Sequence, residues 1–372
     1  MVATLSPEFA ARACIAKSEF PRQLGPKTRF SQSLFRLEFG FECLSGVRKT
    51  AAVKTLVVLI AMLAVFFSGV AADLRIGIIG CDTSHVTAFT ETLNNPAAPG
   101  HIAGGKVVAA YKGGSRDIPA SWNRVEQFSR TLREKYGVQF YNTLEELCAQ
   151  VDAVLLESVD GRPHLEQAQP VLRAHKPLFI DKPMGGSLRD VIEIFRLAEK
   201  AKVPVFSASS LRFATNTQAV AHGSIGKVVY AEVYGPCEVE PHHPDLFWYG
   251  VHGVEALCTT MGLGCQSVQR ARTTDGRIEI IGFWPDGRKG VFREDKDFHG
   301  FAKGPDGESP VGSFNGYEPL LAQIVNFFQT GIPPVQPKET IEIFAFMEAA
   351  DASRQQGGAA VPLKKILKQN GD

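Results

Sequence analysis

Short apolar segments alternate with segments of helical periodicity between residues 74 and 207, and this order restricts the possible folds most. The segment 74–80 reads LRIGIIG and the segment 106–111 reads KVVAAY. Comparable apolar segments follow at 138–141, 151–157, 177–181 and 203–207. Strands that alternate with helices in this way form a doubly wound parallel sheet that is buried on both faces. We therefore predict an α/β fold that begins with such a sheet.

The ends of the predicted strands locate the expected binding crevice. In doubly wound sheets, ligands bind beyond the carboxyl ends of the strands. Gly80, Lys112, residues 158–164 and residues 181–184 each follow one of the predicted strands directly. We expect these four positions to face one crevice.

The first turn has the form of a nucleotide-binding turn but lacks its full glycine pattern. Backbone N–H groups at the start of a helix bind a pyrophosphate, and glycine lets the backbone approach it closely. In the fingerprint G-x-G-x-x-G, Gly80 is present, but Asp82 and His85 stand in place of the second and third glycines. This motif alone leaves dinucleotide binding open. The cofactor contacts predicted in this turn are Gly80, Cys81, Asp82, Thr83 and Ser84.

The end of the second predicted strand is where a dinucleotide site selects its ribose. An acidic residue there would accept hydrogen bonds from the 2′-hydroxyl of NAD. The sequence instead offers Lys112, Ser115 and Arg116, two cations and a hydroxyl that suit a 2′-phosphate. This composition favours NADP over NAD, and a solvated basic loop is the alternative.

The first 72 residues have the pattern of a targeting segment. Three basic residues within 48–54 precede an unbroken apolar run at 56–67, and small residues end at Ala72. This is the order of a secretory signal peptide, and the run is short for a membrane span, which needs about 20 apolar residues. We predict cleavage near Ala72–Asp73 and export to the periplasm or the exterior. An uncleaved membrane anchor is the alternative.

Charge and cysteine usage exclude several classes of protein. The 40 Lys and Arg residues against 39 Asp and Glu residues give a formal net charge of +1. A nucleic-acid partner is therefore not expected, because backbone binding needs a broad basic face. The 7 Cys residues stand singly, with no C-x-x-C pair, so neither a disulfide framework nor a structural zinc site is predicted.

Several segments, in order and spacing, resemble a known family. They are IGIIGC, VDAVLLESVDGRPH, KPLFIDKPMGGSLRDVIEIFRLAEKAKVPVFSASSLRF and YEPLLAQIVNFFQTGIPPVQPKETIEIFAFMEAADASRQQGG. Residues 73–372 resemble the Gfo/Idh/MocA family, the glucose–fructose oxidoreductase and inositol dehydrogenase group. The resemblance implies a Rossmann domain at 73–208 and a C-terminal α/β domain with a large open, predominantly antiparallel sheet at 209–372. It also implies a nicotinamide cofactor, a sugar, polyol or related small-molecule substrate, and a homo-oligomer.

The family's Glu-Lys-Pro motif corresponds to Asp181, Lys182 and Pro183, with Asp in place of Glu. Independently of the family, a Lys just past a buried strand is held at the crevice, where its ammonium stabilises the alkoxide that forms as hydride leaves. The alternative is a surface Lys paired with Asp181, an interaction of about 0–1 kcal/mol. We predict that Lys182 is catalytic and that all three residues contact the cofactor.

The segment GVHGVEALCTTMG places His252 at the family's second catalytic residue, with Trp248 where the family has an Asp. A His with a pKa near neutrality is suited to remove a hydroxyl proton, and a core histidine is the alternative. Glu255 lies on the same helical face and is a candidate substrate contact. In the family's loop after the fourth strand, Ser158, Asp160 and His164 are candidate contacts of the nicotinamide ribose.

The segment PHHPDLFWYG is predicted to line the substrate pocket, its aromatic side chains stacking on a sugar ring. The candidate substrate contacts are Arg212, His242, His243, Trp248, Tyr249 and Glu255. Arg212 fits the family's pattern where the domains join, and a structural role is its alternative. Adjacent His residues in a Pro-flanked loop seldom bind one ion with proper geometry, so no metal site is predicted.

The sequence thus predicts an NAD(P)-dependent oxidoreductase acting on a sugar or polyol, with two alternatives. Free nicotinamide cofactor is scarce outside the cytoplasm, so an exported member would hold it tightly or use it without net redox, as some glycoside-cleaving enzymes do. A binding protein with a decayed site is the second alternative, because Asp82, His85 and Trp248 depart from the expected pattern.

Overall fold

The computed structural model describes residues 72–371 of the chain. The predicted signal peptide, with its apolar run at 56–67, lies outside these residues, and export stays a prediction. Within 72–371, no helix is both long and apolar enough to cross a membrane.

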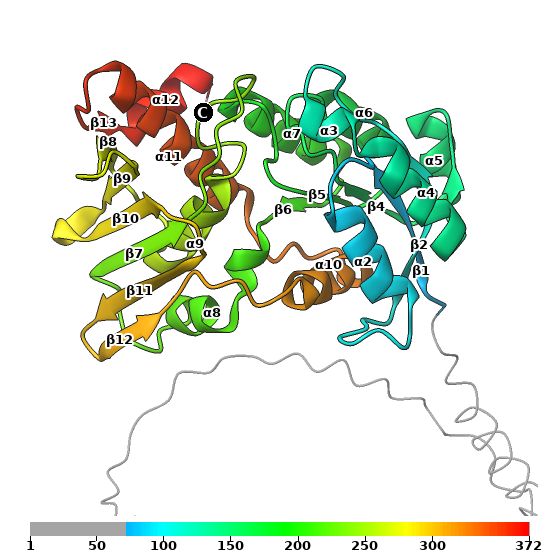
Figure 1. Ribbon diagram of the computed structural model, residues 1–372, viewed down its shortest axis with the longest axis horizontal. Coiled ribbons are helices and arrows are strands. Elements are labelled where there is room, and N and C mark those ends of the chain that lie inside the picture. Colours follow the sequence, from blue (N-terminus) through cyan, green and yellow to red (C-terminus); the bar gives the residue numbers. More distant parts are fainter. Residues whose placement is uncertain (1–71, 372) are drawn as a thin grey trace, which may run out of the picture. The chain divides into compact units, whose positions relative to one another are not determined.

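The first sheet is parallel throughout and confirms the predicted doubly wound fold (Figure 1). Its six strands lie in the order β3-β2-β1-β4-β5-β6, so the strand order reverses between β1 and β4. In doubly wound sheets, ligands bind at this point of reversal. The strands are β1 (Leu74–Ile79), β2 (Gly105–Tyr111), β3 (Gln139–Phe140), β4 (Ala153–Leu156), β5 (Leu178–Ile180) and β6 (Val205–Ser207).

Helices cover both faces of this sheet, because alternate residues of a strand point to opposite sides. Ile78 belongs to the same buried cluster as Phe89 of α2, whereas its neighbour Ile79 belongs to a second cluster with Leu147 of α5. The helices of this part are α2 (His85–Asn94), α3 (Pro119–Trp122), α4 (Val125–Tyr136), α5 (Leu144–Gln150), α6 (His164–Arg173) and α7 (Leu188–Ala201). The apolar strands predicted from the sequence are thus buried on both sides.

The second sheet is mixed and mostly antiparallel, as the family resemblance implied. Its order is β12-β11-β7-β10-β9-β8-β13, and only β7 and β10 pair in parallel among the strands described. The strands are β7 (Tyr230–Gly235), β8 (Ser267–Arg272), β9 (Ile278–Phe283), β10 (Lys289–Glu294), β11 (His299–Gly304), β12 (Gly307–Pro310) and β13 (Val361–Pro362). The remaining helices are η1 (Ser210–Phe213), α8 (Thr215–Ala221), α9 (Val251–Met261), η2 (Pro285–Gly287), α10 (Glu318–Thr330), α11 (Pro337–Gln355) and α12 (Leu363–Asn370).

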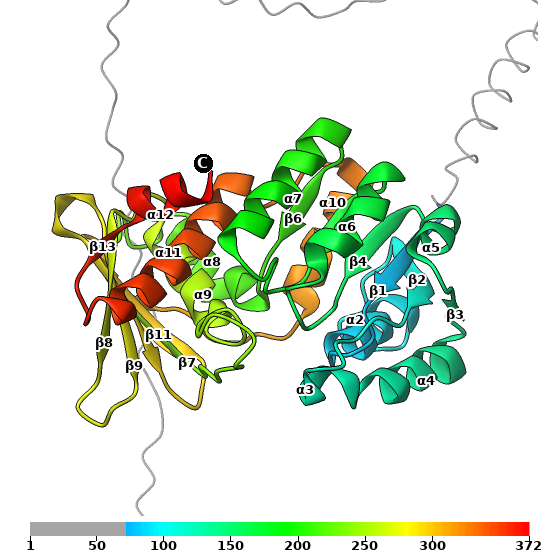
Figure 2. The same cartoon turned by 90° about the horizontal axis from the view of Figure 1, so that it is seen from above.

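Helices connect the two sheets. α9 and α11 pack on one face of the second sheet, and α11 also reaches α7 of the first (Figures 1 and 2). α10 follows β12 in the chain but packs with the first sheet, since its Phe327 lies against Phe206 of β6 with ring centroids 4.9 Å apart. α10 therefore lies after the boundary predicted at 208/209, although it packs against the core of the first sheet.

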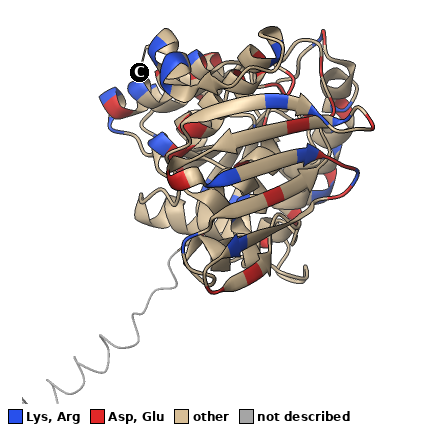
Figure 3. Cartoon of the chain, turned by 90° about the vertical axis from the view of Figure 1, so that its left-hand side faces the viewer, with Lys and Arg blue, Asp and Glu red and all other residues tan. Residues whose placement is uncertain are grey.

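Within residues 72–371, no helix lies in front of the other face of the second sheet, and acidic and basic positions are interspersed over its strands (Figure 3). Glu232 accepts hydrogen bonds from the hydroxyls of Tyr230 and Tyr234 and pairs with Arg293. The homo-oligomer that the resemblance implies stays a prediction.

Candidate active site

A cavity of about 410 Å³ lies at the carboxyl ends of the first sheet's strands, facing α9 of the second part. This volume falls within the usual range of small-molecule sites, about 300–1,000 Å³. It brings together residues predicted from four separate segments of the sequence. The predicted site residues that line it are Thr83, Ser84, Lys182, Trp248, Tyr249 and His252.

Lys182 and His252, the two predicted catalytic residues, line the same cavity. Lys182 follows β5 directly and is 7% exposed, as expected for a side chain held at the crevice. His252 lies in the first turn of α9, where its Nδ1 is 2.7 Å from the hydroxyl oxygen of Ser209. Burial, and then the charge of Lys182, lower the pKa of His252 well below its ordinary value. The imidazole is therefore neutral at physiological pH, the form that accepts a proton.

A buried ion pair lies next to His252, outside the cavity. Arg212 Nε donates to Glu255 at 2.7 Å, and a second nitrogen of Arg212 donates to Glu339 at 2.9 Å. Glu255 also accepts from the N–H of Ser209 at 2.7 Å, the residue whose hydroxyl holds His252. Neither Arg212 nor Glu255 lines the cavity, so the structure places these two candidate substrate contacts behind the site.

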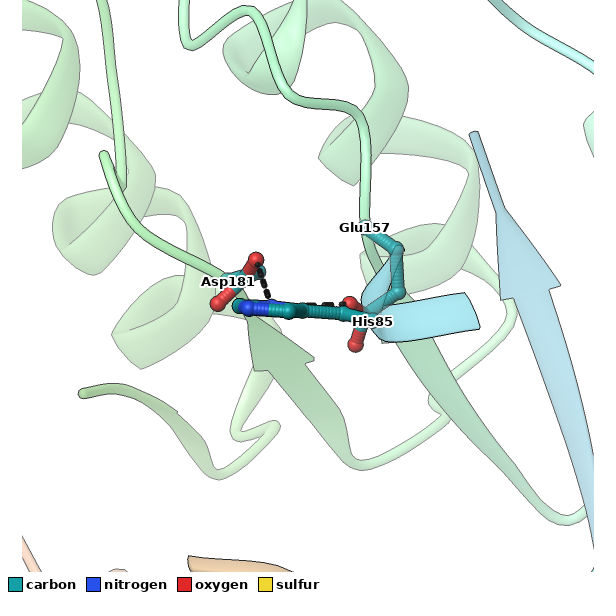
Figure 4. A group of neighbouring side chains, drawn as sticks. All are labelled: His85, Glu157 and Asp181. Carbon is teal, nitrogen blue, oxygen red and sulfur yellow. Dashed lines mark hydrogen bonds and ion pairs between the residues drawn. The ribbon is translucent and has the colours of Figure 1, made fainter. Parts of the chain in front are cut away.

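His85, Glu157 and Asp181 form a buried cluster beside Lys182 (Figure 4). His85 begins α2 and lines the cavity, and its Nδ1 is 2.7 Å from Asp181 and 3.9 Å from Glu157. Burial, and then the negative charge of Asp181, raise the pKa of Glu157 well above its ordinary value. The sequence analysis names His85 only as a departure from the glycine fingerprint, and Asp181 only as part of the motif that corresponds to Glu-Lys-Pro.

The turn after β1 approaches the loop after β4 closely. Gly80 has φ +90°, and a Cβ at this position would lie 2.4 Å from the backbone nitrogen of Ser158. Thr83 and Ser84, at the start of α2, then line the cavity together with Lys182. A tight glycine turn, a helix N-terminus and a lysine are groups that hold the phosphate and ribose of a nucleotide. These residues fit the pyrophosphate and the adjoining ribose of the expected cofactor.

Hydrogen bonds cross the crevice on the side of β2. Asp82 is fully buried and accepts from the Ser121 hydroxyl at 2.6 Å and from the Val159 N–H at 3.1 Å. The hydroxyl of Ser115 donates to Asp160 at 2.5 Å. The loops after β1, β2 and β4 are thus joined where the adenosine end of a dinucleotide lies in this fold. Binding of a whole dinucleotide would have to replace some of these hydrogen bonds.

The two cations predicted to face a 2′-phosphate are engaged with neighbouring side chains. Lys112 pairs with Glu126 at 2.6 Å, and the Arg116 guanidinium lies over the ring of Trp122, 5.0 Å from its centroid. Lys112 is 42% exposed, so its charge is available to a ligand at small cost.

Other residues predicted to contact the cofactor are buried in or between the loops and do not line the cavity. His164 is fully buried, with Nε2 2.8 Å from the carbonyl of Ser158 and Nδ1 3.3 Å from that of Met184. Cys81 is fully buried as well, and burial raises the pKa of its thiol to about 12. Pro183 follows Lys182 in a cis peptide. These residues shape the loops after β1, β4 and β5.

The predicted aromatic loop after β7 contributes only part of its length to the cavity. Trp248 and Tyr249 line it, whereas His242 and His243 do not. Nδ1 of His242 is 2.9 Å from Glu240, and the two ring nitrogens of His243 lie 3.1 Å from Glu240 and 3.0 Å from Asp160. His243 therefore links this loop to the loop after β4.

Sequence reasoning missed most of the remaining cavity wall. Phe298, Phe314 and Tyr317 complete an aromatic wall with Trp248 and Tyr249. Burial raises the pKa of Tyr317 to about 12, and its ring lies 4.8 Å from that of His85. The other unpredicted lining residues are Ala120, Arg124, Ser210, Leu211 and Glu238, whereas Val159 belongs to the segment 158–164 that was expected to face the crevice. Since they come from loops far apart in sequence, only the fold brings them together.

Comparison with known proteins agrees with this architecture. Residues 74–209 match the model of an oxidoreductase family with an NAD-binding Rossmann fold. Over 105 residues, the chain is 35% identical to a myo-inositol 2-dehydrogenase of Thermotoga maritima, covering 26% of this chain and 31% of that protein. The matched segment is thus about a third of that curated relative's length.

Solved structures share the fold at low sequence identity. A probable dehydrogenase from Thermotoga maritima superposes with a TM-score of 0.62 at 21% identity, covering 79% of this chain and 100% of the other. The scyllo-inositol dehydrogenase of Lactobacillus casei with NAD(H) and scyllo-inositol gives 0.62 at 14% identity, again over 79% and 100%. Residues 74–209 are thus similar to the Gfo/Idh/MocA oxidoreductase family, and the described residues share the fold of these solved structures.

Proposed function

We propose that this protein is an NAD(P)-dependent oxidoreductase that removes hydride from a hydroxyl-bearing carbon of a small polyol or sugar. The observation that carries the proposal is the meeting of Lys182 and His252 in one cavity at the carboxyl ends of a Rossmann sheet. The aromatic wall beside them suits a ring with apolar faces and polar edges. The inositol substrates in the names of similar proteins support the same class.

The residues of this chain have distinct roles in the proposed reaction. When bound, the nicotinamide supplies the hydride acceptor. His252 takes the hydroxyl proton on Nε2 while its Nδ1–H donates to Ser209, which fixes the orientation of the ring. The Lys182 ammonium stabilises the negative charge that develops on the same oxygen. Thr83 and Ser84, at the start of α2, would hold the pyrophosphate of the bound cofactor.

The choice of NADP follows from the loop after β2. Lys112 and Arg116 supply two positive charges there, and the residue that directly follows β2 is Lys112 in place of an acidic side chain that would accept from a 2′-hydroxyl. Competitive binding of NADH and NADPH to the purified protein tests this choice. Tighter binding of NADPH is expected.

Dinucleotide binding and turnover test the proposed function directly. The full chain, purified gently, is examined by native mass spectrometry for retained dinucleotide and assayed at 340 nm with NAD, NADP and a panel of cyclitols and sugars. Turnover with at least one polyol is expected, and Lys182→Met should lower kcat by about 10²–10³-fold. Lys364→Met, on distant α12, is the matched control. A protein that neither binds nor reduces either dinucleotide would contradict the proposal.

A second candidate function follows from the apolar segment at 56–67. We propose export on this basis, and an exported enzyme without free cofactor could use a retained dinucleotide for glycoside cleavage with no net redox. Release of the leaving group from an aryl glycoside, with no rise in absorbance at 340 nm, distinguishes this reaction. The N-terminus of the exported protein, found by mass spectrometry, tests the leader.

A further inference from the structure

The cluster of His85, Glu157 and Asp181 is not used by the proposed reaction. Its members come from three separate elements, the start of α2 and the loops that follow β4 and β5. All three side chains are buried, at 7%, 0% and 1% exposure respectively. Figure 4 shows the imidazole between the two carboxylates.

The carboxylates of this cluster lack the partners that buried charges need. Both oxygens of Glu157 and Oδ1 of Asp181 are buried and make no hydrogen bond. A buried carboxylate without a partner is costly, so such groups are normally paired or bound to a metal. The His85–Asp181 contact satisfies one oxygen only, and His85 is 3.9 Å from Glu157, too far for a hydrogen bond.

The positions of the ligand atoms suit a single metal ion. Nδ1 of His85 and one oxygen from each carboxylate all lie within 4.8 Å of one another. Metal–ligand bonds of about 2.0–2.2 Å keep two ligands of one ion within about 4.4 Å of each other. The three ligand atoms therefore lie close to the spacing that a single ion requires. Within the described part of the chain, no other group of three such residues brings its ligand atoms this close.

We propose that His85, Glu157 and Asp181 bind a divalent transition-metal ion such as Zn²⁺ or Mn²⁺. One imidazole nitrogen with two carboxylates is a ligand set for these ions, whereas Mg²⁺ and Ca²⁺ prefer oxygen ligands alone. The two carboxylate charges balance the ion, and the ammonium of Lys182 next to Asp181 opposes it. Three protein ligands leave positions for water or a substrate oxygen, and His85 lines the cavity.

This site departs from the expectation that the chain has no metal ligands. From the sequence, only the histidines around residue 242 were candidate metal ligands, because those lie close together in the chain. Residues 85, 157 and 181 are far apart in sequence, and the parallel sheet brings them together at its carboxyl edge. The inference does not depend on the proposed oxidoreductase activity, since metal binding is measured without turnover.

Metal titration of the full chain tests the proposal. After treatment with a chelator, the protein is titrated with Zn²⁺, and separately with Mn²⁺, by calorimetry, and bound metal is counted by mass spectrometry. One equivalent is expected. Glu157→Gln keeps the size of the side chain and should weaken binding at least about 100-fold, since even the partners of metal ligands contribute 10–100-fold. His85→Gln should have the same effect.

A matched variant separates this site from adventitious binding. Glu240→Gln alters the carboxylate that faces His242 and His243, another place where an ion that binds histidine could bind. This variant should keep the full equivalent, and circular dichroism should show that all variants fold without metal. The proposal is overturned if the wild type binds no stoichiometric metal, if Glu157→Gln binds as tightly as the wild type, or if only Glu240→Gln loses the ion.

Discussion

At the scale of single residues, the environment of His252 sets the pH range that we expect for the proposed reaction. The ring is enclosed by Tyr249 and Phe298, whose centroids lie 5.3 and 5.7 Å from its own. Burial among these rings, and the charge of Lys182, disfavour the imidazolium and lower the pKa. A base with a lowered pKa stays deprotonated as the pH falls through 6.5, the ordinary value for His.

The acid limb of kcat/KM should therefore lie well below pH 6.5 in the wild-type protein. His252→Asn should remove most of the activity, and His222→Asn, an exposed histidine after α8, should leave the profile unchanged. The pH dependence of initial rates, with a polyol found by the panel assay, measures this. An acid limb at or above pH 6.5 would show that His252 is not the base.

Ser115 allows a second test at the residue scale. The sequence predicts it as a cofactor contact, whereas the structure shows its hydroxyl bonded to Asp160 across the crevice. If this bond opposes the dinucleotide, Ser115→Ala should tighten NADPH binding by about fivefold, the equivalent of a net hydrogen bond of about 1 kcal/mol. Weaker binding would instead show direct contact with the cofactor. Fluorescence titration measures the change, with Ser224→Ala, an exposed serine after α8, as the control.

Residue chemistry also explains which parts of the site could be predicted. Lys182 and His252 lie in short motifs beside a strand and a helix. The local sequence was therefore sufficient to predict that both residues lie at the crevice. Glu157 was read only as the end of a buried strand, because its partners lie 72 and 24 positions away in the chain. Phe298 and Tyr317 likewise have no local signal, because only the fold of the second part brings them to the cavity.

At the scale of elements, the buried pair of Arg212 and Glu255 connects η1 to α9, and Glu339 adds α11. Removing one partner of a buried pair leaves an uncompensated charge and costs about 3–5 kcal/mol. Glu255→Ala should lower the free energy of unfolding by this amount. It should also lower kcat, because Ser209 loses the acceptor of its N–H.

Urea denaturation of the variants measures the effect on stability. Glu193→Ala is the control, since Glu193 forms an exposed pair with Arg196 on α7, and it should leave the unfolding free energy close to the wild-type value. An equally small effect of Glu255→Ala would mean that the pair adds nothing to the packing of η1, α9 and α11.

The elements themselves were predictable wherever local chemistry is decisive. A capping box of Thr143 and Glu146 begins α5, and both of its hydrogen bonds form within four residues. The strands of the first sheet were equally clear from their apolar runs. The partner of α10 was not, since an amphipathic helix shows which of its faces is buried but not against which sheet.

At the scale of the whole molecule, α10 makes the two predicted domains depend on each other. Phe327 is fully buried against Phe206 and belongs to the cluster that holds Ile78 and Phe89 under the active-site turn. A Rossmann domain cut at residue 208 would leave this cluster uncovered. The second part thus stabilises the cofactor turn through α10 as well as supplying His252 to the cavity.

Phe327→Ala should therefore lower the stability of the whole described fold by about 3–5 kcal/mol. Because α10 joins the parts, unfolding should remain a single transition, followed together by circular dichroism and by tryptophan fluorescence. Phe314→Ala, at a phenylalanine 47% exposed, is the matched control for stability. If Phe327→Ala instead produced two separate transitions, or if residues 73–208 alone unfolded as cooperatively as the full chain, the first sheet would be an independent unit that does not require α10.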